Sequence, residues 1–183
     1  MNLNNITLKT QEALQRAQQI ALENDHQSIE VGHILKGIFE VDENVTPYIF
    51  KKLSANLAAV KQALNSILDS YPKQAGGGQY LSRPANEAVQ RASTFLKEFG
   101  DEYVALEHLL LGILKVKDSV AQLLKDSGLN EKDLKAAIKA LRKGTKVTSH
   151  GAESTYNALS KYAVNLNEKA KIGKLDPVIG RDE

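Results

Sequence analysis

The chain has 183 residues, of which 25% are charged and 42% are hydrophobic, and this composition excludes a disordered tail and a membrane protein. The absence of cysteine excludes disulfides, zinc–thiolate sites and thiol nucleophiles. Lys and Arg number 24 against 22 Asp and Glu, too small an excess to indicate a nucleic-acid-binding protein. The first residues resemble no signal peptide, and no apolar run reaches the roughly 18 residues of a membrane span. We therefore expect a cytoplasmic protein without a membrane partner.

An internal repeat organises the chain. When the sequence is slid along itself by 75 residues, positions 11–45 align with positions 86–120 without a gap, and 12 of these 35 positions are identical. Several of the mismatches exchange one apolar residue for another, such as Leu14 for Val89 and Ile29 for Val104. Towards the end of each half the register shifts by one residue. The pattern predicts one domain at 1–143, built from a first repeat at about 1–71 and a second at about 79–143.

Each half shows the apolar spacing of helices, and no segment alternates with the period of a strand. The first helix of each half follows a residue suited to the N-cap, Thr7 in the first half and Ser82 in the second. The pattern predicts an all-α fold of eight helices, arranged as a tandem pseudo-twofold repeat of two four-helix halves. A short third helix is expected in each half, and the second and fourth helices are expected at 31–40, 56–69, 106–115 and 130–143.

Two glycines, Gly37 and Gly112, occupy matching positions inside the second helix of each half. A glycine inside a helix costs about 1 kcal/mol relative to alanine. Because both halves carry it, we expect a close helix crossing at each glycine.

The character of the chain changes after Lys143. Residues 144–155 are polar, contain two glycines and are typical of a mobile linker. A new helical pattern begins at Tyr156, and we expect 156–183 to be the truncated start of another domain. The chain by itself is expected to be a monomer.

A search for catalytic and metal-binding motifs assigns no catalytic residue and no metal ligand. His33 and His108 are repeat mates, and no further ligands flank them at the spacing of a metal site. We expect each imidazole to be partly buried and bonded to a nearby backbone carbonyl. Neither a nucleophile elbow nor a phosphate-binding P-loop is found, so these residues are not expected to form an enzyme.

The last helix of the second half is basic, and this supports an alternative function. A helical nucleic-acid-binding module would use the basic 132–146 helix. The helix lacks interleaved aromatic residues for base stacking, and the small net charge also opposes this function. A solvated face is therefore the first interpretation, with no nucleic acid partner. The cations concerned are Lys132, Lys135, Lys139, Arg142, Lys143 and Lys146.

The second half carries apolar bulk that the first half lacks. Phe99 and Tyr103 occupy positions at which the first half has Asn24 and Ser28. If the cores are equivalent, this bulk lies at the surface between the halves and leaves an apolar groove, the kind of site that binds an extended apolar peptide. Asymmetric core packing is the other interpretation, and both stay open.

Particular strings resemble a known family. GHILKGI and EHLLLGI resemble the Clp N-terminal domain, and the final GKLDPVIGRDE resembles the entry into the first ATPase module of the ClpB-type AAA+ disaggregases. The resemblance covers the whole chain. The related ClpC type carries a Glu-His pair in both repeats, whereas the first repeat here has Gly32-His33. This departure favours the ClpB type.

The resemblance implies a chaperone module that engages unfolded or aggregated polypeptide weakly at a hydrophobic groove and passes it to the AAA+ ring. Positions matching the family's polar residues are Thr7, Asp101 and Glu107, with Phe95 on the groove wall. We add Phe99 from the apolar excess described above. The carboxylates are expected to favour segments with Lys or Arg beside the apolar stretch.

For the full-length protein, the resemblance implies a hexameric ATPase of the stress response, containing a coiled coil, that uses ATP and magnesium with a co-chaperone system. Adenine contacts would then fall on Val178, Ile179 and Gly180. The fragment itself is expected to bind no cofactor.

Overall fold

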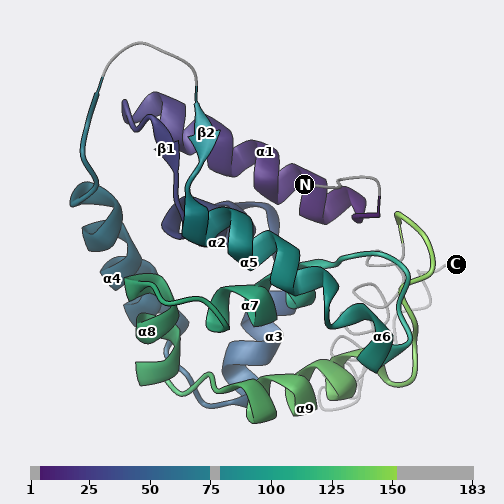
Figure 1. Ribbon diagram of the computed structural model, residues 1–183. Coiled ribbons are helices and arrows are strands. Elements are labelled where there is room, and N and C mark those ends of the chain that lie inside the picture. Colours follow the sequence, from purple (N-terminus) through teal and green to yellow (C-terminus); the bar gives the residue numbers. More distant parts are fainter. Residues whose placement is uncertain (1–4, 75–78, 152–183) are drawn as a thin grey trace, which may run out of the picture.

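The structure is a computed structural model that describes residues 5–74 and 79–151. It confirms the predicted all-α fold, with the fifth of the eight expected helices divided into α5 and α6 (Figure 1). The first half contains α1 (Leu8–Glu23), α2 (Val31–Val41), α3 (Val45–Lys52) and α4 (Leu57–Asp69). The second half contains α5 (Arg83–Ser93), α6 (Leu96–Phe99), α7 (Leu106–Leu114), α8 (Ser119–Asp126) and α9 (Glu131–Arg142).

The division of the fifth helix has a local cause. The hydroxyls of Ser93 and Thr94 donate to the carbonyls of Gln90 and Arg91, three residues back in each case. Such side-chain bonds compete with the helical backbone ladder. The chain therefore leaves the helix after Ser93 and makes one more turn before Gly100, which ends α6 in the left-handed conformation at φ 69°.

Both predicted N-caps are confirmed. The Thr7 hydroxyl accepts a hydrogen bond from the Thr10 backbone N–H at 3.1 Å, and the Ser82 hydroxyl accepts one from the Ala85 N–H at the same distance. Each bond satisfies a backbone donor that the first helical turn leaves free.

The halves exchange short extended segments, which the sequence did not predict. Strands β1 (Ser28–Ile29) and β2 (Tyr80–Leu81) pair in parallel, with Ile29 opposite Leu81. Ile6 forms a parallel bridge with Val104. Because Ile6 is the repeat mate of Leu81 and Ile29 is the mate of Val104, each half lends its leading segment to the other half. These strands are too short for an alternating pattern to show in the sequence.

The helices of the two halves pack in equivalent pairs. α1 packs on α2 as α5 packs on α7, and α3 contacts α9 as α4 contacts α8. In Figure 1, α1 and α5 run side by side in opposite directions. The second helices, α2 and α7, contact each other near the centre and carry most of the fully buried large side chains. This arrangement is the one expected for a pseudo-twofold axis between the halves.

The glycine crossings are also confirmed. A Cβ atom on Gly37 would collide with the Ala13 carbonyl oxygen of α1, and one on Gly112 would collide with the Ala88 carbonyl oxygen of α5. In both cases the obstructing atom is a backbone carbonyl oxygen, which cannot rotate out of the way as a side chain could. Glycine is required because each helix pair packs backbone against backbone.

The segment after α9 differs from the mobile linker expected at 144–155. In its described part, up to residue 151, Val147 is fully buried and its carbonyl accepts from the Glu102 N–H at 2.8 Å. Further on, the His150 carbonyl accepts from the Leu8 N–H at 3.0 Å. The segment is polar by composition, yet its backbone bonds hold it against the body. Residues 152–155 and the predicted start of a further domain at 156–183 lie outside the described residues.

None of the helices in the described part of the chain combines the length and the hydropathy that a membrane span requires.

Candidate functional site

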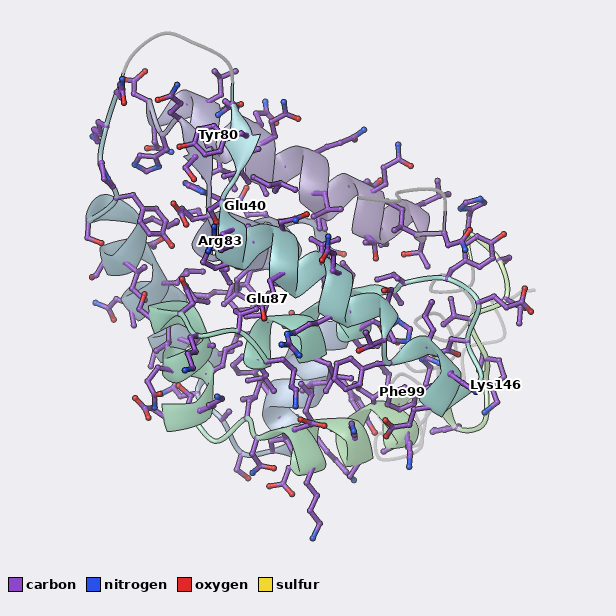
Figure 2. The ribbon with its side chains drawn as sticks, in the orientation of Figure 1. Glu40, Tyr80, Arg83, Glu87, Phe99 and Lys146 are labelled. Atoms are coloured by element: carbon purple, nitrogen blue, oxygen red, sulfur yellow. The ribbon has the colours of Figure 1, made fainter. Side chains whose placement is uncertain are left out.

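The five residues predicted to bind substrate are all buried. Phe95 and Phe99 are each 6% exposed, and Phe99 is the last residue of α6, next to the end of α9 (Figure 2). Thr7, Asp101 and Glu107 are also buried. The Thr7 hydroxyl accepts from the Thr10 amide and also donates to the Thr10 hydroxyl at 2.9 Å, so it is occupied by its capping role.

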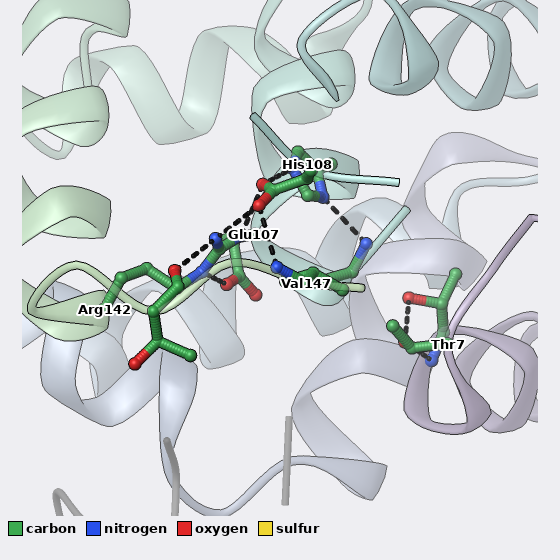
Figure 3. Close-up of polar contacts among 9 residues, drawn as sticks. Thr7, Glu107, His108, Arg142 and Val147 are labelled. Atoms are coloured by element: carbon green, nitrogen blue, oxygen red, sulfur yellow. Dashed lines mark hydrogen bonds and ion pairs between the residues drawn. The ribbon is translucent and has the colours of Figure 1, made fainter. Parts of the chain in front are cut away.

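A buried ionic cluster in the second half joins two of these residues (Figure 3). Nε of Arg142, at the end of α9, donates to Glu107 Oε2 at 2.7 Å, and its two terminal nitrogens donate to the two oxygens of Asp101 at 2.9 and 3.0 Å. His108 Nε2 lies 2.8 Å from the same Asp101 carboxylate. The guanidinium also sits 5.9 Å from the Phe99 ring centre. We call Asp101, Glu107, His108 and Arg142 the ionic cluster.

Hydrogen bonds determine the tautomer of His108 and the charge of Asp101. The Ala105 N–H donates to His108 Nδ1 at 2.7 Å, so the ring hydrogen lies on Nε2 and is donated to Asp101. Burial by itself raises the pKa of Asp101, but the bonds from His108 and Arg142 outweigh it and lower that pKa from 3.8 to about 2. Asp101 therefore stays ionised at physiological pH, and its charge is used inside the fold.

The ionic cluster also holds the segment after α9. Asp101 Oδ1 accepts from the Val147 N–H at 2.9 Å, which anchors that segment beside the start of α1. There the His150 ring bonds the Ile6 carbonyl at 2.9 Å. Asp101 thus helps to position Ile6, because it anchors Val147 in the segment whose His150 bonds the Ile6 carbonyl.

Two pockets open beside α1, and Ile6 lines both. The first has a volume of about 320 Å³ and the second about 270 Å³. Since they share Ile6 and Leu14, we treat them as two lobes of one groove and call it the interhalf groove. Lobe 1 is lined by Ile6, Gln11, Leu14, Gln15, Ala17, Gln18, Ile29, Ile34 and Leu81. Lobe 2 is lined by Asn5, Ile6, Thr10, Leu14, Val89, Gln90, Ser93, Leu96, Val104 and Leu109.

The lining of the interhalf groove is apolar with a neutral polar rim. Exposed amides and a hydroxyl, including Gln15, Gln18, Gln90 and Ser93, border the apolar floor. Among the described residues that line the two lobes, none is charged. The groove therefore suits an uncharged apolar ligand, and none of the five predicted residues lines it.

The sequence analysis missed two features of this site. Arg142 was assigned to a solvated basic face, yet it points inward because two buried carboxylates need its charge. The groove residues Ile6 and Leu81 fall outside the helical patterns and become neighbours of α1 only through the exchanged strands. The sequence did contain one signal for Arg142. Glu107 takes the place that Gly32 has in the first half, and a carboxylate on an apolar helix needs a cationic partner.

The basic helix α9 carries less free charge than its composition indicates. Arg142 is buried in the ionic cluster, and Lys135 pairs with Glu131 at 2.8 Å and Glu98 at 3.1 Å. Lys135 also lies 5.1 Å from the ring centre of Phe95. These contacts weaken the case for a nucleic-acid-binding face.

The two repeated histidines differ from expectation in their partners. Both rings are fully buried, and each accepts from a backbone N–H rather than bonding a carbonyl. In the first half, the Glu30 N–H donates to His33 Nδ1, and His33 Nε2 lies 2.8 Å from His26 Nδ1. No group of three or more His, Cys, Asp or Glu suited to a metal ion occurs in the part of the chain that the structure describes.

Comparisons with known proteins agree with this fold. Residues 5–127 match the family of the Clp repeat (R) N-terminal domain. The chaperone protein ClpB of Bacteroides thetaiotaomicron is 52% identical over 183 residues, which is all of this chain and 21% of that protein. The ClpB of Gloeobacter violaceus is 38% identical over 184 residues, again covering 100% of this chain and 21% of that protein. The chain thus spans about one fifth of the length of these curated relatives.

Solved structures show the same fold at lower identity. The N-terminal domain of Hsp104 from Candida albicans superposes with a TM-score of 0.70 at 20% identity, covering 81% of this chain and 99% of that one. The N-terminal domain of the ClpV1 ATPase from Escherichia coli gives a TM-score of 0.66 at 20% identity, covering 77% and 88%. The family match covers more than half of the chain, and the chain therefore belongs to the Clp N-terminal domain family.

Proposed function

We propose that this domain binds unfolded or aggregated polypeptide weakly in the interhalf groove and passes it to the ATPase ring of a disaggregase. The observation that carries the proposal is an open, uncharged apolar groove of two lobes, bordered by exposed amides, on a domain of the ClpB type. An extended apolar segment fits this chemistry, because its side chains enter the floor and its backbone meets the amides.

Weak binding follows from the same geometry. A shallow groove buries little area, and an unfolded segment loses conformational entropy when it is ordered there. We expect dissociation constants in the micromolar range or weaker. Such binding suits a module that must release its client.

The predicted contact role of Thr7, Phe95, Phe99, Asp101 and Glu107 stays a prediction. We now favour an indirect role for Thr7 and Asp101. Thr7 caps α1 next to Ile6, and Asp101 anchors the segment that bonds Ile6. Selection of Lys- or Arg-flanked segments by Asp101 and Glu107 is not part of the present proposal, since both carboxylates pair with Arg142.

The remaining features are proposed for the full-length protein on the family resemblance alone. They are a cytoplasmic hexameric ATPase using ATP and magnesium, an adenine contact at residues 178–180, and a co-chaperone partner. Residues 178–180 lie outside the described residues.

A matched pair of variants on α1 tests the groove. Leu14 lines both lobes, whereas Leu22 on the same helix is 64% exposed and lines neither lobe. Leu14→Ser is expected to weaken binding of an uncharged apolar peptide about tenfold, since burying a leucine side chain contributes roughly 1.5–3 kcal/mol. Leu22→Ser should bind like the parent.

Backbone NMR titration measures both affinity and position. Shifts should cluster on Gln15, Gln18, Gln90 and Ser93. Shifts confined to α9, or equal binding by a folded Leu14→Ser variant, would reject the groove as the peptide-binding site.

A further inference from the structure

The two lobes of the interhalf groove are related by the internal repeat. Most residues that line lobe 1 have their mates, 75 positions away, in lobe 2. Gln15 of lobe 1 corresponds to Gln90 of lobe 2, Ile29 to Val104 and Ile34 to Leu109. Leu81 of lobe 1 corresponds to Ile6, which lines both. The pseudo-twofold axis therefore passes between the lobes and exchanges them.

We propose that the interhalf groove holds an extended apolar peptide in either chain direction. The inference rests on the proposed function. A twofold rotation that exchanges the ends of a groove maps a bound peptide onto the same peptide running the opposite way. If the lobes were identical, the two directions would bind equally, so only the differences between the lobes create a preference.

The rim chemistry is suited to both directions. A glutamine side chain offers a carbonyl that accepts and an NH₂ group that donates. Gln15 and Gln90, both exposed at the rim, can each pair with a peptide N–H or a peptide C=O. Reversing the peptide exchanges the order of these backbone groups, and the amides accommodate the exchange by rotating. Among the described lining residues no fixed charge marks one end of the groove.

The mated lining residues of the two lobes differ little. Leu14 of the first repeat is matched by Val89 of the second, and Gln18 by Ser93. One buried methylene changes a binding constant by about fourfold. Both directions should therefore be populated, with a ratio of less than about tenfold. A direction-tolerant groove captures an apolar segment whichever way the unfolded chain presents it.

Spin labels at opposite peptide ends test the inference. An uncharged apolar peptide carries a nitroxide at its amino end in one sample and at its carboxyl end in another. Each labelled peptide is expected to broaden the amide signals of both Gln15 and Gln90. If the amino-terminal label broadens one lobe and the carboxyl-terminal label broadens only the other, the peptide has a single direction and the inference is wrong.

An unlabelled titration separates the two proposals. Binding in the groove with a single direction overturns the inference and leaves the proposed function standing. An absence of groove shifts with the unlabelled peptide overturns both.

A reciprocal pair of exposed substitutions gives the second readout. With a peptide that carries one lysine near its amino end, Gln90→Glu should enrich the direction that places the lysine in lobe 2, and Gln15→Glu should enrich the opposite direction. An exposed ion pair shifts such a ratio by roughly twofold to fivefold. Enrichment of the same direction by both variants would also refute the inference.

Discussion

The two halves share one backbone arrangement, but different side chains surround the repeated histidine, His33 in the first half and His108 in the second. In the second half, the His108 ring donates to Asp101, and Arg142 joins Asp101 to Glu107. In the first half, the matching imidazole of His33 meets a second imidazole, His26, and packs 5.2 Å from the Tyr71 ring centre. The second half therefore surrounds its histidine with buried charged groups, and the first half surrounds its histidine with neutral rings.

Three matched positions explain the difference. Asp101 corresponds to His26, and Glu107 to Gly32. Arg142 corresponds to Leu68 once the one-residue register shift is counted. A Cβ atom at Gly32 would meet the Tyr71 hydroxyl at 2.5 Å, so the tyrosine occupies the space that the Glu107 side chain would need. A buried charge is tolerated only with its partners present, which is why the charged set occurs together in one half and is missing together from the other.

Removing the cation of the ionic cluster should have the largest effect on stability. Arg142→Ala leaves two buried carboxylates without their guanidinium, and we expect a loss of about 3–5 kcal/mol in the free energy of unfolding. Urea unfolding followed by circular dichroism measures it. Arg91→Ala is the matched control, because Arg91 pairs with Glu87 at the surface and should contribute at most about 1 kcal/mol. Similar losses in both variants would contradict a special role for the ionic cluster.

A second test concerns what the halves have in common. Gly112→Ala and Gly37→Ala should each destabilise the domain by about 2 kcal/mol, because overpacking against backbone outweighs the helix propensity gained. The control is Gly151→Ala, where a Cβ would meet nothing within 4 Å. Its unfolding midpoint should match that of the parent. A Gly112→Ala domain as stable as the parent would show that the second crossing can relax and would contradict the packing explanation.

Acid should distinguish the halves. Burial, together with neighbouring His26, lowers the pKa of His33 from 6.5 to about 4, so the folded first half binds fewer protons than the unfolded chain and loses stability as pH falls from 6.5 to 4. Asp101, with its pKa lowered to about 2, retains its contribution until the pH falls below 3.8. The first loss should be on the order of 3 kcal/mol.

Amide hydrogen exchange at pH 7, 5 and 4 measures this difference. Protection of α2 and the end of α4 should fall before protection of α7 and α9, because His33 packs against Tyr71, which follows α4. Equal loss in both halves at pH 5 would mean that the domain opens as one unit and that the histidine pair is not its acid-sensitive part.

The helical halves could be predicted from the sequence because helix periodicity, N-caps and the 75-residue repeat are local or directly comparable signals. Thr7, Ser82, Gly37 and Gly112 took the places predicted for them, since each acts on the backbone nearest to it. Contacts between helices are different: Arg16 of α1 pairs with Glu40 of α2 at 2.6 Å. A partner on another helix is not visible in one helix's spacing.

The candidate site was harder to predict from the sequence, because its contacts also join different helices. Phe99 was identified by the apolar excess of the second half, and Phe95, Asp101 and Glu107 by the family resemblance. The sequence did not show whether these side chains face a ligand or one another. Only the packing of α9 against α6 and α7 decides that the carboxylates face Arg142. Likewise, the interhalf groove forms where exchanged segments place Ile6 and Leu81 beside α1. Sequence alone determined the helices and their duplication, because those depend on neighbours in the chain. Tertiary structure decided the charge pairing and the groove, because both depend on residues up to 144 positions apart.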